Sequence, residues 1–197
     1  MKQRIITSTA VILASAEALL VLVSWLLSAT MTGGVRSLLS SEGVRWFALH
    51  LSDMLLTPLL LWLLLASMAW GCLRHSGLLP GLATARTYRE QLARRVAMLT
   101  TAAYLALTAL LVAVPHAVLL SATGRLWPSP FSAALLPLLC LGGIQAAVAY
   151  GLIARHFRSV ADICQSFTDG LAAASPLLFI YVLAMQLWAS LRFVFTF

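Results

Sequence analysis

The sequence predicts an all-α integral membrane protein, a bundle of about five transmembrane helices. Of its 197 residues, 61% are hydrophobic and only 10% are charged, and the mean hydropathy is +0.96. Soluble domains are roughly half apolar and one-quarter charged. The apolar runs lack the alternation of transmembrane barrel strands, and a helix satisfies its backbone hydrogen bonds internally, as lipid requires. Helices are therefore the predicted spanning elements.

Each predicted span is an apolar run bounded by charge, glycine or proline. A spanning helix takes about 20 apolar residues to cross a hydrocarbon core about 30 Å thick, so this chain has room for only a few. We expect residues 1–197 to form a single transmembrane domain. Its spans lie at about residues 5–31, 51–73, 96–121, 131–154 and 171–194.

The basic residues predict the orientation of these spans. With the N-terminus inside, most of the 13 Lys and Arg residues are cytoplasmic, so the positive-inside rule favours an N-in, C-out topology in the cell inner membrane. Their scatter through short loops argues against a nucleic-acid partner despite the net charge of +7. The cytoplasmic set is Lys2, Arg4, Arg74, Arg86, Arg89, Arg94, Arg95, Arg155 and Arg158, and the external set is Arg36, Arg45, Arg125 and Arg192.

Glu17 is the most informative charge in the first span. An ionised carboxylate in mid-membrane costs at least a few kcal/mol without a partner, water or a proton, so Glu17 should face the protein interior. At helical spacing it shares a face with Ser24 and Ser28, a polar stripe that another helix or a crevice could cover. It is either a protonatable coupling group or a neutral acid hydrogen-bonded between helices.

The segment Leu38–Phe47, LLSSEGVRWF, precedes the second span and predicts a short interfacial helix with Trp46 as its aromatic anchor. After that span comes a basic cytoplasmic loop at residues 74–95, which is helical in pattern beyond Pro80. Arginines of this kind favour the anionic inner leaflet, each contributing on the order of 1 kcal/mol. Docking of a cytoplasmic or membrane protein partner on this loop is the alternative.

The third span carries Thr101, Tyr104 and Thr108 on one face, which ends near His116. Hydroxyls of this kind usually join helices, with average energies under ~1 kcal/mol, so packing is favoured over substrate contact. His116, beside Pro115, is a better ligand candidate, although an interfacial role is favoured for it too.

The fourth span has small residues at four-residue intervals, Gly143, Ala147 and Gly151, which predict a packing seam. Its partner is either a helix of this chain or a second copy in a homo-oligomer. The last span has Pro176 at its start or at a kink, and a short polar face made of Gln186 and Ser190.

The sequence contains no motif that predicts an enzyme, a cofactor or a metal. Cys72 and His75 have the spacing of half a metal site, but no second pair follows them. There is no phosphate-binding glycine loop, no nucleophile elbow and no HExxH. The candidate polar site within the membrane therefore consists of Glu17, Ser24, Tyr104 and His116, and it is not catalytic.

Two blocks of the sequence carry motifs of a known kind. The first block is Ser40, Glu42, Gly43, Trp46 and Phe47, then Gly71 and Ser76-Gly77-Leu78-Leu79-Pro80. The second block is Ser129-Pro130-Phe131, Ala149-Tyr150-Gly151 and the run from Val160 to Gln186 with Ser166 and Ala184. Together they resemble the AbgT family of secondary transporters, in which Leu-Leu-Ser-x-Glu-Gly-x-x-Trp introduces the second membrane segment and Gly-Leu-Leu-Pro ends it.

The resemblance implies an abbreviated family member. AbgT transporters are longer, and they bind substrate between re-entrant hairpins and broken helices. The serine- and aspartate-rich hairpin motif has no counterpart between Pro80 and Ser129, and the chain stops soon after Phe193. Arg74 stands where the family usually has a glutamate. No substrate or ion residue is therefore carried over to this chain.

Two functions follow from these observations. The first is transport of aminobenzoyl-glutamate-like or other small anionic solutes by a shortened AbgT-type secondary transporter, and the alternative is a non-transporting membrane scaffold or accessory subunit derived from that family. The resemblance and Glu17 favour transport. The absence of the hairpins and the single mid-membrane carboxylate favour the scaffold.

Overall fold

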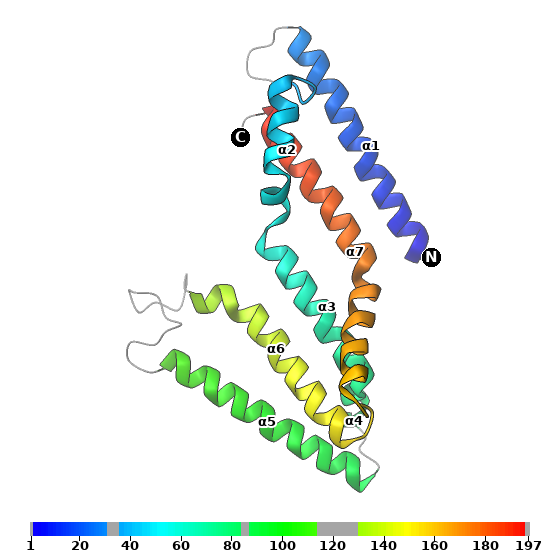
Figure 1. Cartoon of the computed structure of the whole chain (residues 1–197), viewed down its shortest axis with the longest axis vertical. Coiled ribbons are helices and arrows are strands. Elements are labelled where there is room, and N and C mark those ends of the chain that lie inside the picture. Colours follow the sequence, from blue (N-terminus) through cyan, green and yellow to red (C-terminus); the bar gives the residue numbers. More distant parts are fainter. Residues whose placement is uncertain (1, 31–35, 84–86, 114–129, 196–197) are drawn as a thin grey trace. The chain divides into compact units, whose positions relative to one another are not determined.

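The computed structural model describes residues 2–30, 36–83, 87–113 and 130–195. These residues form helices and no strand (Figure 1). Five of the helices, α1, α3, α5, α6 and α7, are long and apolar enough to cross a membrane, which confirms the predicted all-α fold. The helices are α1 (Lys2–Ala29), α2 (Ser41–Leu55), α3 (Pro58–Ser76), α4 (Leu78–Ala83), α5 (Tyr88–Ala113), α6 (Pro130–Ile153) and α7 (Val160–Phe195).

The chain forms two compact units. Unit 1 consists of Met1–Leu61 and Ser175–Phe197, and unit 2 consists of Trp62–Ala174. Helices α3 and α7 each contribute residues to both units, because the boundaries fall inside them.

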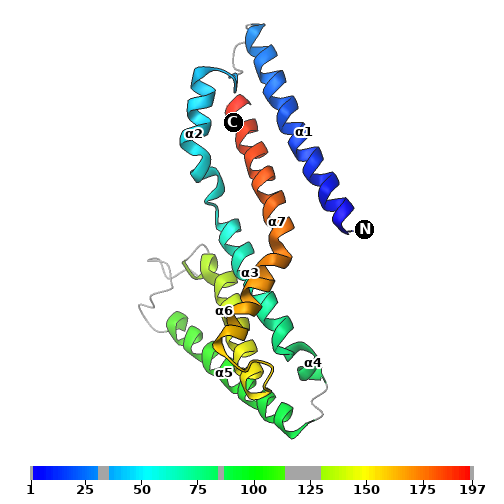
Figure 2. The same ribbon diagram turned by 45° about the vertical axis from the view of Figure 1, so that its right-hand side comes forward.

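In unit 1 the C-terminal half of α7 lies between α1 and α2, as the two views agree (Figures 1 and 2). The buried centre is Leu38, Phe193 and Val194, with Trp46 packed against it. The rings of Trp46 and Phe193 stack with centroids 4.3 Å apart. Trp46 is thus fixed to α7, and the aromatic residue predicted as an anchor also packs two helices together.

Helix α2 is the short helix predicted ahead of the second span. Ser40 caps it, since its backbone is extended and its hydroxyl accepts a hydrogen bond from the Gly43 N–H at 3.0 Å. A Cβ on Gly43 would lie 2.6 Å from the Leu38 carbonyl oxygen. The serine and glycine of the LLSSEG run therefore allow the chain to fold tightly onto the first turn of α2.

The second span begins later than predicted. The apolar run starts near residue 51, but α2 continues to Leu55 and the spanning helix α3 begins only at Pro58. Pro58 has no N–H and disfavours helical geometry at Thr57, so one helix must end before it and another can begin at it. The predicted span therefore covers the end of one helix, an interruption, and most of a second helix.

In unit 2 the helices α3 and α7 cross with their backbones in contact. A Cβ on Gly71 would lie 2.6 Å from the Gly170 Cα and would also meet the Ser166 carbonyl oxygen. A Cβ on Gly170 would lie 3.0 Å from the Gly71 Cα. Only glycine permits this approach, which is the usual role of small residues between membrane helices.

The predicted seam on α6 packs within the chain. Ala147 is fully buried in a cluster with Cys72 of α3 and Phe157, a residue that follows α6. A Cβ on Gly143 would meet Leu73 at 3.9 Å, and one on Gly151 would clash with the Phe157 ring. The seam therefore has a partner in this chain, α3 and the segment after α6.

Two helix starts differ from the sequence prediction. Helix α5 begins at Tyr88 and α7 at Val160, whereas the apolar runs begin near residues 96 and 171. Charged residues such as Arg94 and Asp169 end an apolar run without ending a helix. Of the two positions predicted for Pro176, the start of the last helix is excluded, since Pro176 lies inside α7. The last residues of the predicted span 96–121 lie outside the described residues.

Substitution of Gly71 by alanine tests the crossing. We expect Gly71→Ala to lower the free energy of unfolding by about 1–3 kcal/mol, because the new methyl group overpacks the contact with α7. Gly143→Ala is the matched control, since its methyl group would make an ordinary contact at 3.9 Å. Unfolding by denaturing detergent measures both variants, and equal stabilities would contradict the crossing.

Candidate functional site

Glu17 points into unit 1, as predicted. Its Oε1 accepts a hydrogen bond of 2.6 Å from the hydroxyl of Ser190, a fully buried residue of α7. Its Oε2 is buried and has no hydrogen-bond partner among the residues that the structure describes. Glu17 is thus held by one oxygen, while the other remains available to a proton or a ligand.

A small pocket of about 240 Å³, which we call the Glu17 pocket, adjoins this carboxylate. It joins two polar stripes that the sequence showed separately, since Gln186 and Ser190 of α7 face Glu17 of α1. Apolar side chains form the rest of its wall. Its lining residues are Glu17, Val21, Leu38, Leu39, Val44, Phe47, Gln186 and Ser190.

The other predicted site residues are not gathered around Glu17. Ser24 is fully buried, and its hydroxyl donates to the Val21 carbonyl at 2.8 Å and accepts from the Leu38 N–H at 3.3 Å. Tyr104 belongs to unit 2, where it donates to the Leu138 carbonyl at 2.9 Å. These two hydroxyls hold backbone segments in place. His116 lies outside the described residues.

The interruption between α2 and α3 was not predicted from the sequence. Leu56 leaves helical geometry at φ −77° and ψ 57°. The buried Tyr181 of α7 donates to the Leu55 carbonyl at 3.0 Å and also hydrogen-bonds the Thr57 hydroxyl. Tyr181 therefore ties this segment to α7, in addition to the hydrogen bond of 2.8 Å that the Thr57 N–H donates to the Leu55 carbonyl. Pro58 within an apolar run was the available signal.

A larger pocket of about 560 Å³, which we call the arginine pocket, lies between α2 and α7 in unit 1. Its wall includes Thr57 at the interruption, two arginines, and three aromatic rings. The lining residues are Arg36, Trp46, His50, Asp53, Met54, Thr57, Met185, Trp188, Ala189, Arg192 and Phe193.

The arginine pocket combines cationic and aromatic groups. The Arg36 guanidinium lies 6.0 Å from the centre of the Phe193 ring and 3.8 Å from the exposed Glu42 carboxylate. The His50 ring stacks on Trp46 at 5.5 Å, with its Nδ1 3.0 Å from the Trp46 carbonyl oxygen. Guanidinium groups bind carboxylates through paired hydrogen bonds, and aromatic rings stack on planar groups. An organic anion with a flat apolar body fits this chemistry.

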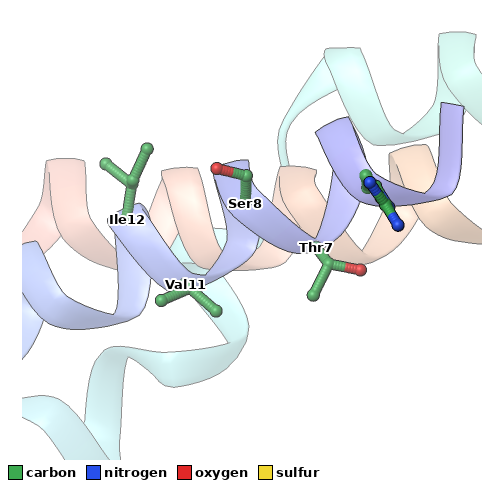
Figure 3. Close-up of a pocket in the computed structure, with 5 residues that line it drawn as sticks. Thr7, Ser8, Val11 and Ile12 are labelled. Carbon is green, nitrogen blue, oxygen red and sulfur yellow. The ribbon is translucent and has the colours of Figure 1, made fainter. Parts of the chain in front are cut away.

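Two further pockets lack the combination of charged and aromatic side chains that the arginine pocket has. The groove between α5 and α6, about 350 Å³, includes Tyr104, Gly142 and Gly143 in its largely apolar wall. The other is a shallow hollow along α1, where Thr7, Ser8, Val11 and Ile12 project from a single helix (Figure 3). Over the described part of the chain, no three histidine, cysteine or acidic side chains gather as a metal site would require.

Removal of the Tyr181 hydroxyl tests its role at the interruption. Tyr181→Phe deletes both hydrogen bonds to the Leu55–Thr57 segment, so we expect a loss of about 1 kcal/mol in stability. Hydrogen exchange should rise in peptides that cover the interruption. Tyr88→Phe, at a site that is 80% exposed, is the control. Identical exchange in the two variants would show that Tyr181 does not hold this segment.

Part of the chain matches the model of a known protein family. The model of the AbgT putative transporter family matches residues 81–194, which include α5, α6 and nearly all of α7. The block at Ser129–Gln186 lies inside the match, and the block at Ser40–Pro80 lies outside it. Comparison with curated proteins and with solved structures found no match. Because the family match spans more than half of the 197 residues, the chain belongs to the AbgT family of membrane transporters.

Proposed function

We propose that this AbgT-family chain is a proton-coupled secondary transporter of small organic anions in the cell inner membrane. The observation that carries the proposal is the arginine pocket beside an interrupted helix. Transporters commonly place their substrate sites at discontinuous helices, where backbone groups and helix ends are available to a ligand. Aminobenzoyl-glutamate-like compounds are the substrates that we propose to test first.

The chemistry of the arginine pocket supports an anionic aromatic solute. Arg36 and Arg192 contribute positive charge, and Trp46 and Trp188 contribute aromatic side chains to the wall. Asp53 lies in the same wall and suits an amino group of the solute. The volume of about 560 Å³ falls in the range of roughly 300–1,000 Å³ that small-molecule pockets occupy.

Glu17 supports coupling to protons. Ionisable groups within membrane spans commonly form ion or proton pathways, and this carboxylate has one buried oxygen without a partner among the described residues. Ser190 and Gln186 place it against α7, the helix that also forms one wall of the arginine pocket. A change in the charge of Glu17 would therefore act on a helix that contacts the solute.

The orientation is also part of the proposal. The excess of Lys and Arg on one side of the spans supports an N-in, C-out topology. In that topology Arg36 and Arg192 belong to the external set, so the arginine pocket would receive solute from the outer side of the membrane.

The solute site is tested by uptake of radiolabelled aminobenzoyl-glutamate into proteoliposomes. We expect Arg36→Gln to raise KM roughly 10- to 100-fold, since a hydrogen bond to a charged group contributes about 1.5–3 kcal/mol. Arg45→Gln is the matched control, because Arg45 lies on α2 but does not line the pocket. Equal KM values for the two variants would place the solute elsewhere.

Proton coupling is tested in the same vesicles with Glu17→Gln. We expect the variant to lose the stimulation of uptake by an inward proton gradient while it retains solute exchange across the membrane. Glu90→Gln, which changes a carboxylate of unit 2 that lines neither the Glu17 pocket nor the arginine pocket, should keep both activities.

Two results would contradict the transport proposal. If Glu17→Gln keeps its response to the gradient, Glu17 does not carry the coupling. If the well-folded wild type shows neither uptake nor exchange of aminobenzoyl-glutamate or of other small organic anions, the transport hypothesis is wrong. The non-transporting scaffold then becomes the better hypothesis.

A further inference from the structure

The groove between α5 and α6 in unit 2, which we call the α5–α6 groove, has a wall suited to hydrocarbon. The three hydroxyls of its described wall are already hydrogen-bonded to the backbone. Thr101 and Thr108 donate to carbonyls of their own helix at 2.7 and 2.9 Å, and Tyr104 donates to a carbonyl of α6 at 2.9 Å. The rest of the described wall consists of leucine, glycine and alanine. A polar solute would lose its hydration here with few partners in return, whereas an acyl chain would not.

Small residues of α6 keep the groove hollow. A Cβ on Gly142 would lie 3.0 Å from the Tyr104 ring, so the wall has no room for a side chain at this position. Leu105 and Leu139 border the groove and are 55% and 63% exposed. The volume of about 350 Å³ extends over Thr101–Thr108, roughly 10 Å of helix at 1.5 Å per residue. The groove is therefore elongated and open at its side.

Arg94 lies on the same face of α5 as the groove. Thr101 and Thr108 follow it at i+7 and i+14, spacings that return to one side of an α-helix. Its charge interacts with the Tyr150 hydroxyl of α6, so the guanidinium lies where α5 faces α6. Arg94 is partly buried, and its guanidinium makes no hydrogen bond or ion pair with another residue that the structure describes. A cation without a counter-ion thus lies at one end of an apolar groove.

The distance between Arg94 and the groove suits a phospholipid. At a rise of 1.5 Å per residue, Thr101 lies about 10 Å and Thr108 about 20 Å from Arg94 along the helix. Half of the hydrocarbon core is about 15 Å thick, and the headgroup layer adds several ångströms. A headgroup held at Arg94 therefore has its acyl chains at the depth of the groove.

The charge around this end of α5 favours an anionic headgroup. Arg89 and Arg95 are exposed in the first turns of α5, and Arg155 follows the end of α6. Glu90 is a carboxylate on the same face of α5 as Arg94, and it accepts a hydrogen bond of 3.2 Å from the Thr87 N–H at the start of the helix. Arginines outnumber carboxylates here, and basic groups of this kind attract anionic lipids.

We propose that Arg94 and the α5–α6 groove together bind one anionic phospholipid. The phosphate lies at the Arg94 guanidinium, and one acyl chain occupies the groove between Thr101 and Thr108. A cation at the end of an apolar groove favours an amphiphile over the apolar face of a second copy of the chain. The site uses no residue that lines the Glu17 pocket or the arginine pocket, so it is independent of solute transport.

The headgroup contact is tested by native mass spectrometry of the full chain. The protein is mixed with equal amounts of phosphatidylglycerol and phosphatidylcholine that have identical acyl chains. We expect the wild type to retain one phosphatidylglycerol in preference to phosphatidylcholine, and Arg94→Gln to lower this preference roughly fivefold. Arg95→Gln is the matched control and should keep the preference. It removes the same charge from an exposed position about 100° around the helix.

The acyl-chain contact is tested by filling the groove. We expect Thr108→Trp to weaken the binding of phosphatidylglycerol several-fold, because the indole would occupy the space of the chain. Leu107→Trp is the matched control, since Leu107 is 56% exposed and does not line the groove. Circular dichroism of each variant shows whether it is folded.

Three outcomes would overturn the proposal. Equal retention of the two lipids by the wild type would mean that the groove only contacts bulk lipid. Equal effects of Arg94→Gln and Arg95→Gln would mean that the attraction is general and not specific to this face. If Thr108→Trp converts a dimer to a monomer and leaves lipid binding unchanged, the groove is a contact between copies. The two arginine variants decide the matter if Thr108→Trp does not fold.

Discussion

A backbone polar group that is withdrawn from water needs a hydrogen-bond partner inside the protein, and this requirement shapes unit 1. Pro58 cannot continue the helical hydrogen bonds, so the chain leaves helical geometry between α2 and α3. The Tyr181 hydroxyl reaches this segment from α7 and bonds the Leu55 carbonyl and the Thr57 hydroxyl. These bonds stabilise the interruption, and one of its residues, Thr57, contributes to the wall of the arginine pocket. A single tyrosine links the local geometry of one helix to the position of another.

The sequence predicted the helical membrane fold well, because hydropathy reports directly on the length of chain that can occupy a bilayer. It predicted helix ends less well, since charged residues at the membrane surface end an apolar run while the helix continues. This is why α5 begins at Tyr88 and α7 at Val160, ahead of the predicted spans. Pro58 is present in the sequence. To predict that the helix is interrupted there, one would need to know that Tyr181 can hydrogen-bond the interrupted segment.

The candidate site was predicted only in part. The position of Glu17 in an apolar run indicated an inward carboxylate, and the structure confirms this. Its partner Ser190 is 173 residues away along the chain, so no local pattern could identify it. For the same reason, His75 was compared with its neighbour Cys72 as a metal half-site, whereas its ring meets Asp169 of a distant helix. Helix faces can be read from spacing, but the pairing of faces depends on tertiary packing.

Helix α7 separates two pockets of different chemistry within unit 1. Gln186 and Ser190 form part of the Glu17 pocket, and Trp188 and Arg192 form part of the arginine pocket. Since the same rigid helix carries both sets of side chains, a small rotation about its axis would reshape the two walls together. Occupancy of either pocket that favours one rotation must then alter the affinity of the other by the same factor, as reciprocal linkage requires. Binding in one pocket would then be coupled to binding in the other through the rotation of α7.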